Sequence, residues 1–157
     1  MAEFSLSARS LDRLRGVNPK LQAVVRRAIT LTKVDFGVIE GVRTLERQQE
    51  LFDSKASQTM KSKHLADEDG YGSAVDLMAY VKGRGCWELN VYDDIADAMK
   101  EAAIEAQVAI RWGCAWQINN ICDWDGTMEA AMNDYIDFKR ISGKRPFLDG
   151  PHFELSE

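Results

Sequence analysis

Apolar residues recur every three or four positions along two stretches of the chain, which is the period of an amphipathic helix. The first of these stretches begins with Asn18 and Pro19, a pair that is typical of a helix start. Besides these two stretches, Thr44 can cap a helix over "LERQQELF". One more helix is expected to begin near Met128. The pattern therefore predicts four helices, at about 19–32, 45–52, 93–107 and 128–139.

Four shorter stretches predict strands, because they are apolar, brief and in part rich in β-branched residues. One of them, "SAVDLMAYV", lies between the glycine-containing segments "EDGYG" and "KGRG", which predict turns at both of its ends. In another, "PHFEL", Pro151 restricts the entry to the start or the edge of a strand. The expected strands are 35–42, 73–81, 108–112 and 151–155.

This order of elements indicates an α+β fold, in which helices pack on a small, mainly antiparallel sheet. The chain has 157 residues, of which 45% are hydrophobic and 29% are charged, as is typical of a globular protein of ordinary size. The sequence contains no repeat, low-complexity tract or linker that would divide it. We therefore expect a single catalytic domain over 1–157.

Charge, apolar runs and cysteines narrow the possible partners and compartments. The net charge of −5 gives no general attraction to phosphates, so nucleic acid is not an expected partner. No apolar run reaches the roughly 18–20 residues of a membrane span and the start lacks a signal peptide, so we expect no membrane insertion and synthesis in the cytoplasm. We expect a monomer whose cysteines are reduced packing residues: Cys86, Cys114 and Cys122.

The two histidines of the chain, His64 and His152, are candidate metal ligands together with Asp76. Zinc is commonly held by imidazole nitrogens and carboxylate oxygens, and a catalytic zinc site keeps three protein ligands so that water can take the fourth position. Asp76 and His152 lie on expected strands, which hold ligands rigidly. The spacing alone does not distinguish this zinc site from ordinary histidines without a metal.

Two further side chains have chemistry that suits such a site. Asp149 stands three residues before His152, where a carboxylate can take a proton from the attacking water and deliver it to the leaving amine. The alternative is that "LDGP" is only a turn. Arg43, with Gln48 nearby, can bind a substrate carboxylate or steady an oxyanion, although by itself it is an ordinary surface arginine.

Four sequence blocks resemble a known family of enzymes: "GVRTLERQ", "SKH" with "AVDL", "IRWGCAW" and "DGPHFEL", in this order. Together they are similar to the zinc peptidases of bacterial cell walls that include D-Ala-D-Ala carboxypeptidases and dipeptidases. Within that group, the chain is most similar to the single-domain L-alanyl-D-glutamate endopeptidases that tailed phages use as endolysins. The resemblance spans about 18–155 and implies a Hedgehog/D-Ala-D-Ala peptidase-like fold with a zinc site on the sheet.

The resemblance also implies roles for individual residues. It implies zinc ligation by the two histidines and one aspartate: His64, Asp76 and His152. Asp149 would be the catalytic acid and base, and Arg43 would steady the substrate or the oxyanion. Four more residues are implied at the substrate site, either as supports or near the groove: Ser62, Gln48, Trp112 and Trp116.

The chain departs from the family pattern on the substrate side. The stretch between the first two expected ligands, 65–75, is longer than in phage relatives and is expected to form a surface loop. Ala115 stands where relatives often carry an acid, and the segment 117–145 is also longer. The details of substrate binding are therefore left open.

Some members of this group respond to calcium, but the acidic segment that follows "IRWGCAW" does not fit an EF-hand loop. Aligning Gly126 with the required glycine of such a loop places Ile121 and Met132 at positions that need carboxylates. Calcium regulation is therefore not expected.

The predicted function is that of a phage endolysin, a zinc endopeptidase that cuts the L-Ala–D-Glu bond of the peptidoglycan stem peptide and causes host lysis. We expect it to stay in the host cytoplasm until lysis and then to act on the cell wall. One alternative is a D,D- or L,D-carboxypeptidase of cell-wall metabolism, although such enzymes normally need export. The other is a binding domain that keeps the zinc fold without hydrolysis, against which the presence of Asp149 argues.

Overall fold

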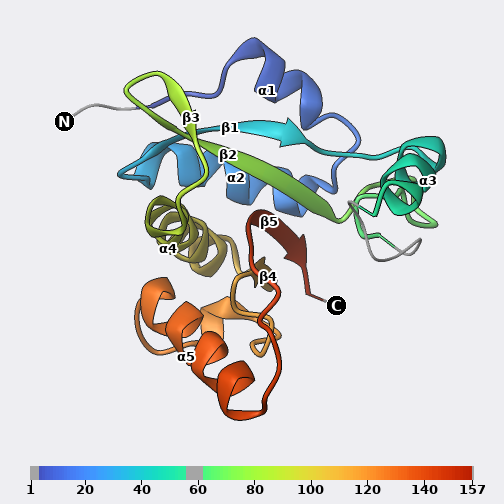
Figure 1. Cartoon of the computed structure of the whole chain (residues 1–157). Helices are drawn as coiled ribbons and strands as arrows, with labels where there is room; N and C mark the ends of the chain where they lie inside the picture. The colour runs from blue at the N-terminus through green and yellow to red at the C-terminus, as the bar shows by residue number, and fades with distance from the viewer. Residues whose placement is uncertain (1–3, 56–61, 157) are drawn as a thin grey trace.

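A five-stranded sheet runs through the computed structural model, which describes residues 4–55 and 62–156 (Figure 1). Its strands are β1 (Asp35–Glu40), β2 (Ala74–Val81), β3 (Arg84–Cys86), β4 (Ile110–Gly113) and β5 (Asp149–Leu155). The helices are α1 (Ala8–Arg13), α2 (Pro19–Leu31), α3 (Leu45–Asp53), α4 (Leu89–Ala106) and α5 (Met128–Ile141), with a short 3₁₀ turn, η1 (Ile121–Asp123).

The strands follow the order β1-β2-β5-β4, with β3 paired to β2, and all of these pairings are antiparallel. β5, from the end of the chain, therefore lies between β2 and β4, which come from its middle. The predicted α+β fold with a mainly antiparallel sheet is confirmed. The four expected helices and four expected strands all form, with shifted ends.

The core lies between this sheet and the helices α4 and α2. α4 contacts β2, β4 and β5, and α2 packs against α4. The helical periodicity of α2 explains this arrangement, because its apolar stripe is the face that is buried: Leu21, Val24, Val25, Ala28 and Ile29. From the sheet, Leu77, Trp112 and Phe153 join the same core and are fully buried. Burying each such side chain contributes roughly 1.5–3 kcal/mol.

The helix α1 was not predicted from the sequence, and it protects the edge of the sheet. Ser10 Oγ accepts a hydrogen bond from the backbone N–H of Val38 at 2.9 Å, and Arg13 Nη1 donates one to the backbone carbonyl of Val38 at 3.0 Å. These two backbone groups lie on the edge strand β1, where they would otherwise be open to another strand. Figure 1 shows α1 lying alongside β1.

The strand β3 was also not predicted, since "KGRG" was taken only as the end of the preceding strand. Lys82 and Gly83 form a two-residue hairpin turn with φ of 54° and 77°. Positive φ at both positions is the type I′ geometry that joins adjacent antiparallel strands. The chain therefore turns back on itself and forms β3.

The helix α4 begins at Leu89, earlier than the expected start near 93. Its first turn is anchored by Tyr92, which is fully buried. The Tyr92 hydroxyl donates to the carbonyl of Cys86 at 2.7 Å and accepts from the N–H of Ala79 at 3.1 Å. This tertiary contact, which periodicity cannot reveal, extends the helix towards its N-terminus.

Other expectations concerned the surface and the cysteines. Residues 66–71 are exposed, so the predicted surface loop is confirmed. The three cysteines are free, with Cys114 buried and Cys86 and Cys122 half-buried against the core, as expected of packing residues. Among the described residues, no helix is both long enough and apolar enough to cross a membrane.

Candidate metal centre and active site

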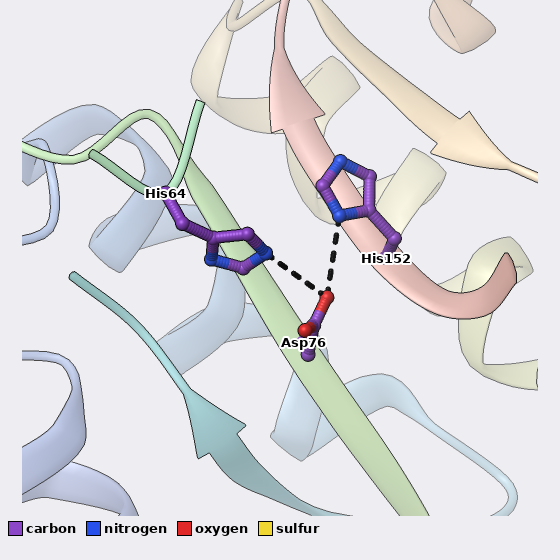
Figure 2. Close-up of side chains that lie close together, drawn as sticks. All are labelled: His64, Asp76 and His152. Carbon is purple, nitrogen blue, oxygen red and sulfur yellow. Dashed lines mark hydrogen bonds and ion pairs between the residues drawn. The ribbon is translucent and has the colours of Figure 1, made fainter. Parts of the chain in front are cut away.

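His64, Asp76 and His152 meet at the middle of the sheet (Figure 2). Asp76 on β2 is paired directly with His152 on β5, and His64 precedes β2. His64 Nε2 and His152 Nδ1 each lie 3.2 Å from the same oxygen, Asp76 Oδ1. One potential ligand atom from each residue lies within 4.8 Å of the others. Within residues 4–55 and 62–156, no other group of three such side chains converges in this way.

The orientation of His64 is set by a backbone carbonyl on one side of its ring and by the Asp76 carboxylate on the other. The carbonyl of Gly41 lies 2.9 Å from Nδ1, which leaves Nε2 directed towards Asp76. A Cβ on residue 41 would lie 2.0 Å from the carbonyl oxygen of Arg13, so only glycine fits here. The backbone N–H of His64 also donates to Ser62 Oγ at 3.1 Å.

His152 contacts a second carboxylate, Glu154, which the sequence reasoning missed. His152 Nε2 lies 2.8 Å from Glu154 Oε1, and Lys63 Nζ lies 3.4 Å from the other carboxylate oxygen. Residues i and i+2 of a strand point to the same face, so the spacing of His152 and Glu154 was a signal that could have found this contact.

The charges of this cluster shift two pKa values in opposite directions. Burial alone would raise the pKa of Asp76, but the hydrogen bonds from His152 and His64 outweigh it and hold this pKa well below its usual range. Burial alone would lower the pKa of His152, but its hydrogen bonds to Asp76 and Glu154 outweigh burial and raise this pKa to about 9. A metal ion would therefore replace bound protons at this cluster.

Asp149 begins β5 and lies beside the cluster without belonging to it. It pairs with Gly113 of β4, where a Cβ would lie 2.1 Å from the carbonyl oxygen of Asp149, so glycine is required for the close approach. The alternative that "LDGP" is only a turn is wrong, because these residues lead directly into the strand. The register shift between Trp112 and Gly113 accommodates Pro151 inside β5.

The environment of Asp149 favours the exchange of a proton. Burial raises the pKa of this carboxyl above its ordinary value, and the charge of Asp76 raises it further. The positive charges of His152, His64 and Arg43 act in the opposite direction without cancelling the shift. Asp149 is therefore electrostatically coupled to every member of the cluster.

Arg43 is buried beside the same cluster, so its description as an ordinary surface arginine is wrong. Its side chain is 8% exposed and makes a two-point ion pair with Glu40, at 2.8 Å from Nε and 2.7 Å from Nη2. Nη1 donates to Gln48 at 2.6 Å and to Ser62 at 3.3 Å, and Nη2 lies 3.8 Å from Asp76. These contacts hold the guanidinium next to a candidate ligand.

Gln48 and Ser62 both contact Arg43, and Ser62 also accepts a hydrogen bond from the backbone of His64. Gln48 is fully buried and Ser62 is half-buried. The Gln48 side chain is accordingly closed to solvent in this structure, and it accepts a hydrogen bond from Arg43.

The two tryptophans of "IRWGCAW" have different positions. Trp112 is fully buried, stacks on Phe153 and donates from Nε1 to the carbonyl of Gly150 at 2.8 Å. The structure thus places it in the core, and contact with substrate is not supported. Trp116 lies 5.6 Å from His152 between ring centroids and stacks on Phe147, a residue that is 52% exposed. Phe147 was missed, because no local pattern links it to the site.

Comparisons with known proteins show the family to which this chain belongs. The family model of phage L-alanyl-D-glutamate peptidases matches residues 1–156. The chain belongs to this family. An L-alanyl-D-glutamate peptidase of Escherichia phage T5 is 30% identical over 156 residues, which cover 97% of this chain and 98% of that protein. The crystal structure of the Serratia marcescens L-Ala D-Glu endopeptidase ChiX is 34% identical and has a TM-score of 0.68, covering 98% of this chain and 90% of that chain.

Membership of the phage L-alanyl-D-glutamate peptidase family confirms the resemblance predicted from the four sequence blocks. It also confirms that the chain is related to peptidases rather than to an unrelated class of enzyme. The roles of individual residues in this peptidase stay predictions, which the geometry above makes specific.

Proposed function

We propose that this chain is a zinc-dependent endopeptidase that cleaves the L-Ala–D-Glu bond of the peptidoglycan stem peptide and acts as a phage endolysin. The observation that carries the proposal is the convergence of three potential ligand atoms within 4.8 Å, from His64, Asp76 and His152, beside Asp149. The bond is proposed from the two relatives, both of which are named for L-Ala and D-Glu.

The donor set fits zinc. Two imidazole nitrogens and one carboxylate oxygen are three ligands of the kinds that zinc prefers, and three protein ligands are what a catalytic zinc site uses. When bound, zinc would polarise the scissile carbonyl and lower the pKa of a water molecule. His64 would bind through Nε2 and His152 through Nδ1, the nitrogens that face Asp76.

Asp149 would handle the proton. Its carboxylate would accept a proton as water attacks the scissile carbonyl carbon, and would then donate that proton to the nitrogen of the leaving amine. The raised pKa of Asp149 suits this transfer, because a group that both accepts and donates a proton works best when its pKa lies closer to the working pH. The rigid pairing with Gly113 keeps the carboxylate in place.

Arg43 would supply a fixed positive charge. Negative charge develops on the carbonyl oxygen during the attack, and a preorganised cation near that oxygen stabilises the transition state. Glu40, Gln48 and Ser62 hold the guanidinium in place, so little reorganisation is needed during the reaction. The Nη2 nitrogen of this guanidinium also faces Asp76 and the cluster.

The exposed ring of Phe147 and the neighbouring Trp116 would form an aromatic wall for the substrate. Trp116 contacts His152 directly, so this wall begins at the cluster and continues to the surface. Aromatic rings offer a large contact area for apolar parts of a peptide. Both residues are therefore proposed as substrate-binding residues.

The biological setting follows from this activity. As an endolysin, the protein would act as a monomeric single domain, remain in the host cytoplasm until lysis, and then reach the peptidoglycan of the cell wall. Cutting the stem peptide next to L-Ala detaches it, with all its cross-links, from the glycan strand. A carboxypeptidase that trims a terminal D-Ala severs no cross-link, so that alternative explains lysis less well.

The test is a digestion of intact, purified sacculi followed by mass spectrometry of the released peptides. We expect new N-terminal glutamate on those peptides. Free D-alanine as the sole product would assign the enzyme to the carboxypeptidases instead, and the absence of any product would favour the non-hydrolytic binding domain.

A further inference from the structure

We infer that Glu154 is a positioning residue for the metal centre: it fixes the ring of His152 so that Nδ1 faces the metal, and Lys63 holds Glu154 in place. This inference rests on the proposed zinc site. It concerns a carboxylate that has no role in the proton transfer described above.

Glu154 lies two residues after His152 on β5, so both side chains are on the same face of the strand. Glu154 Oε1 lies 2.8 Å from His152 Nε2, on the opposite side of the ring from Nδ1 and Asp76. The Glu154 side chain is only 9% exposed, so water cannot easily replace it.

Metal binding through Nδ1 requires one particular tautomer of His152. A neutral imidazole carries one proton, and a metal can bind only the nitrogen that lacks it. With Nδ1 as the ligand, the proton must stay on Nε2, where it donates a hydrogen bond to Glu154. A carboxylate in this position favours the required tautomer, fixes the ring orientation and makes the ligand nitrogen more basic.

Lys63 lies directly before His64 and forms an ion pair with Glu154. Its ammonium group lies 3.4 Å from Glu154 Oε2 and donates to the carbonyl of Leu155 at 2.7 Å. A carboxylate that is this well buried requires a charged partner, and Lys63 provides it. The segment that carries His64 is thus joined to the strand that carries His152, so the two ligands are fixed relative to each other.

The experiment compares zinc binding by the full chain and by the variants Glu154→Gln and Glu154→Ala, measured by competition with a chromophoric chelator. Loss of a carboxylate that orients a metal-binding histidine typically costs 10–100-fold in metal affinity. We expect a loss of roughly this size for Glu154→Ala and a smaller loss for Glu154→Gln, whose amide oxygen can still accept the hydrogen bond. Lys63→Met should have a zinc affinity between that of the wild type and that of Glu154→Ala.

The matched control is Glu105→Gln, which removes a carboxylate from a surface ion pair with Arg27 and should leave zinc affinity unchanged. A second readout is the ¹⁵N–¹H NMR signal of the His152 imidazole in the zinc-loaded protein. The Nε2 proton should give a downfield, slowly exchanging signal in the wild type, and this signal should be lost in Glu154→Ala. Circular dichroism would confirm that each variant is folded, and Glu154→Gln keeps the shape of the side chain if Glu154→Ala does not fold.

The possible failures are distinguishable. A wild-type protein that binds no zinc would overturn the proposed zinc chemistry and this inference together. If the wild type binds zinc and the Glu154 variants bind it equally well, with the His152 signal unchanged, the inference about Glu154 is overturned and the proposed function is not.

Discussion

Asp149 shows how a single residue acquires a role from its surroundings. Its side chain is the same as that of the many exposed aspartates of this chain, but the approach of Gly113 and its place at the start of β5 bury it next to two histidines and an arginine. Burial raises its pKa, and its charged neighbours include the proposed zinc ligands. The chemistry thus depends on the backbone around the residue.

Changing Asp149 to Asn should abolish most of the activity while zinc content and fold are retained. The amide has nearly the same shape, so the pairing with Gly113 remains, but it cannot accept and return a proton. General acid–base catalysis contributes roughly 10²–10⁴-fold, so turnover of peptidoglycan should fall by at least that order. Elemental analysis would check the zinc. Near-normal turnover would show that Asp149 is not the proton carrier, and a loss of zinc would make it a ligand.

Among individual residues, the sequence allowed prediction of those whose side-chain chemistry is distinctive. A chain with only two histidines offers few ways to build a histidine zinc site, so His64 and His152 became candidates together with Asp76. The resemblance then supported this set and Asp149. Glu154 and Phe147 were not found, because glutamate and phenylalanine are ordinary residues until the fold brings them to the site. Trp112 was assigned to the groove from its motif, whereas tertiary packing places it in the core.

Among the elements, α1 has a structural role that its short length conceals. Six residues are too few to form a stable helix in isolation, so α1 depends on its contacts with β1. Its side chains satisfy two backbone groups of the edge strand, and β1 leads directly to Gly41 and Arg43. The element therefore supports the segment that orients His64.

Changing Ser10 to Ala should lower the free energy of unfolding by about 1–3 kcal/mol, because the buried N–H of Val38 would lose its acceptor. Urea unfolding monitored by circular dichroism would measure the change. Ser142→Ala is the matched control, since that hydroxyl is exposed at the end of α5 and its removal should change stability by no more than about 0.5 kcal/mol. Equal effects of the two substitutions would contradict the proposed role of α1.

Periodicity and turn residues predicted the longer elements, but not the short ones. α2 and α5 have clear start signals and lengths of several turns, and both were expected close to their observed bounds. α1 and β3 are too short to show a period, and the early start of α4 depends on the contact of Tyr92 with a distant strand. Tertiary contacts determine these short elements and this helix start, and such contacts cannot be read from a local sequence pattern.

For the whole molecule, the sheet order explains why a single site forms from distant parts of the chain. β5 is inserted between β2 and β4, so the last strand must be in place before His152 can meet Asp76. The candidate metal site therefore forms only when the complete sheet is folded. Since a ligand that binds only the folded state stabilises it, zinc should also raise the melting temperature of the intact chain.

The proposed mechanism requires one zinc ion, held by His64, Asp76 and His152, for cleavage of the stem peptide. The most direct test is to titrate metal-free protein with zinc and to measure, in the same samples, bound zinc and new N-terminal glutamate released from peptidoglycan. We predict that activity rises in proportion to occupancy, reaches its maximum at about one zinc per chain, and is absent in His152→Ala, since a catalytic site of this kind needs all three protein ligands. Full activity in the metal-free protein, or stoichiometric zinc binding and normal cleavage by His152→Ala, would contradict the account.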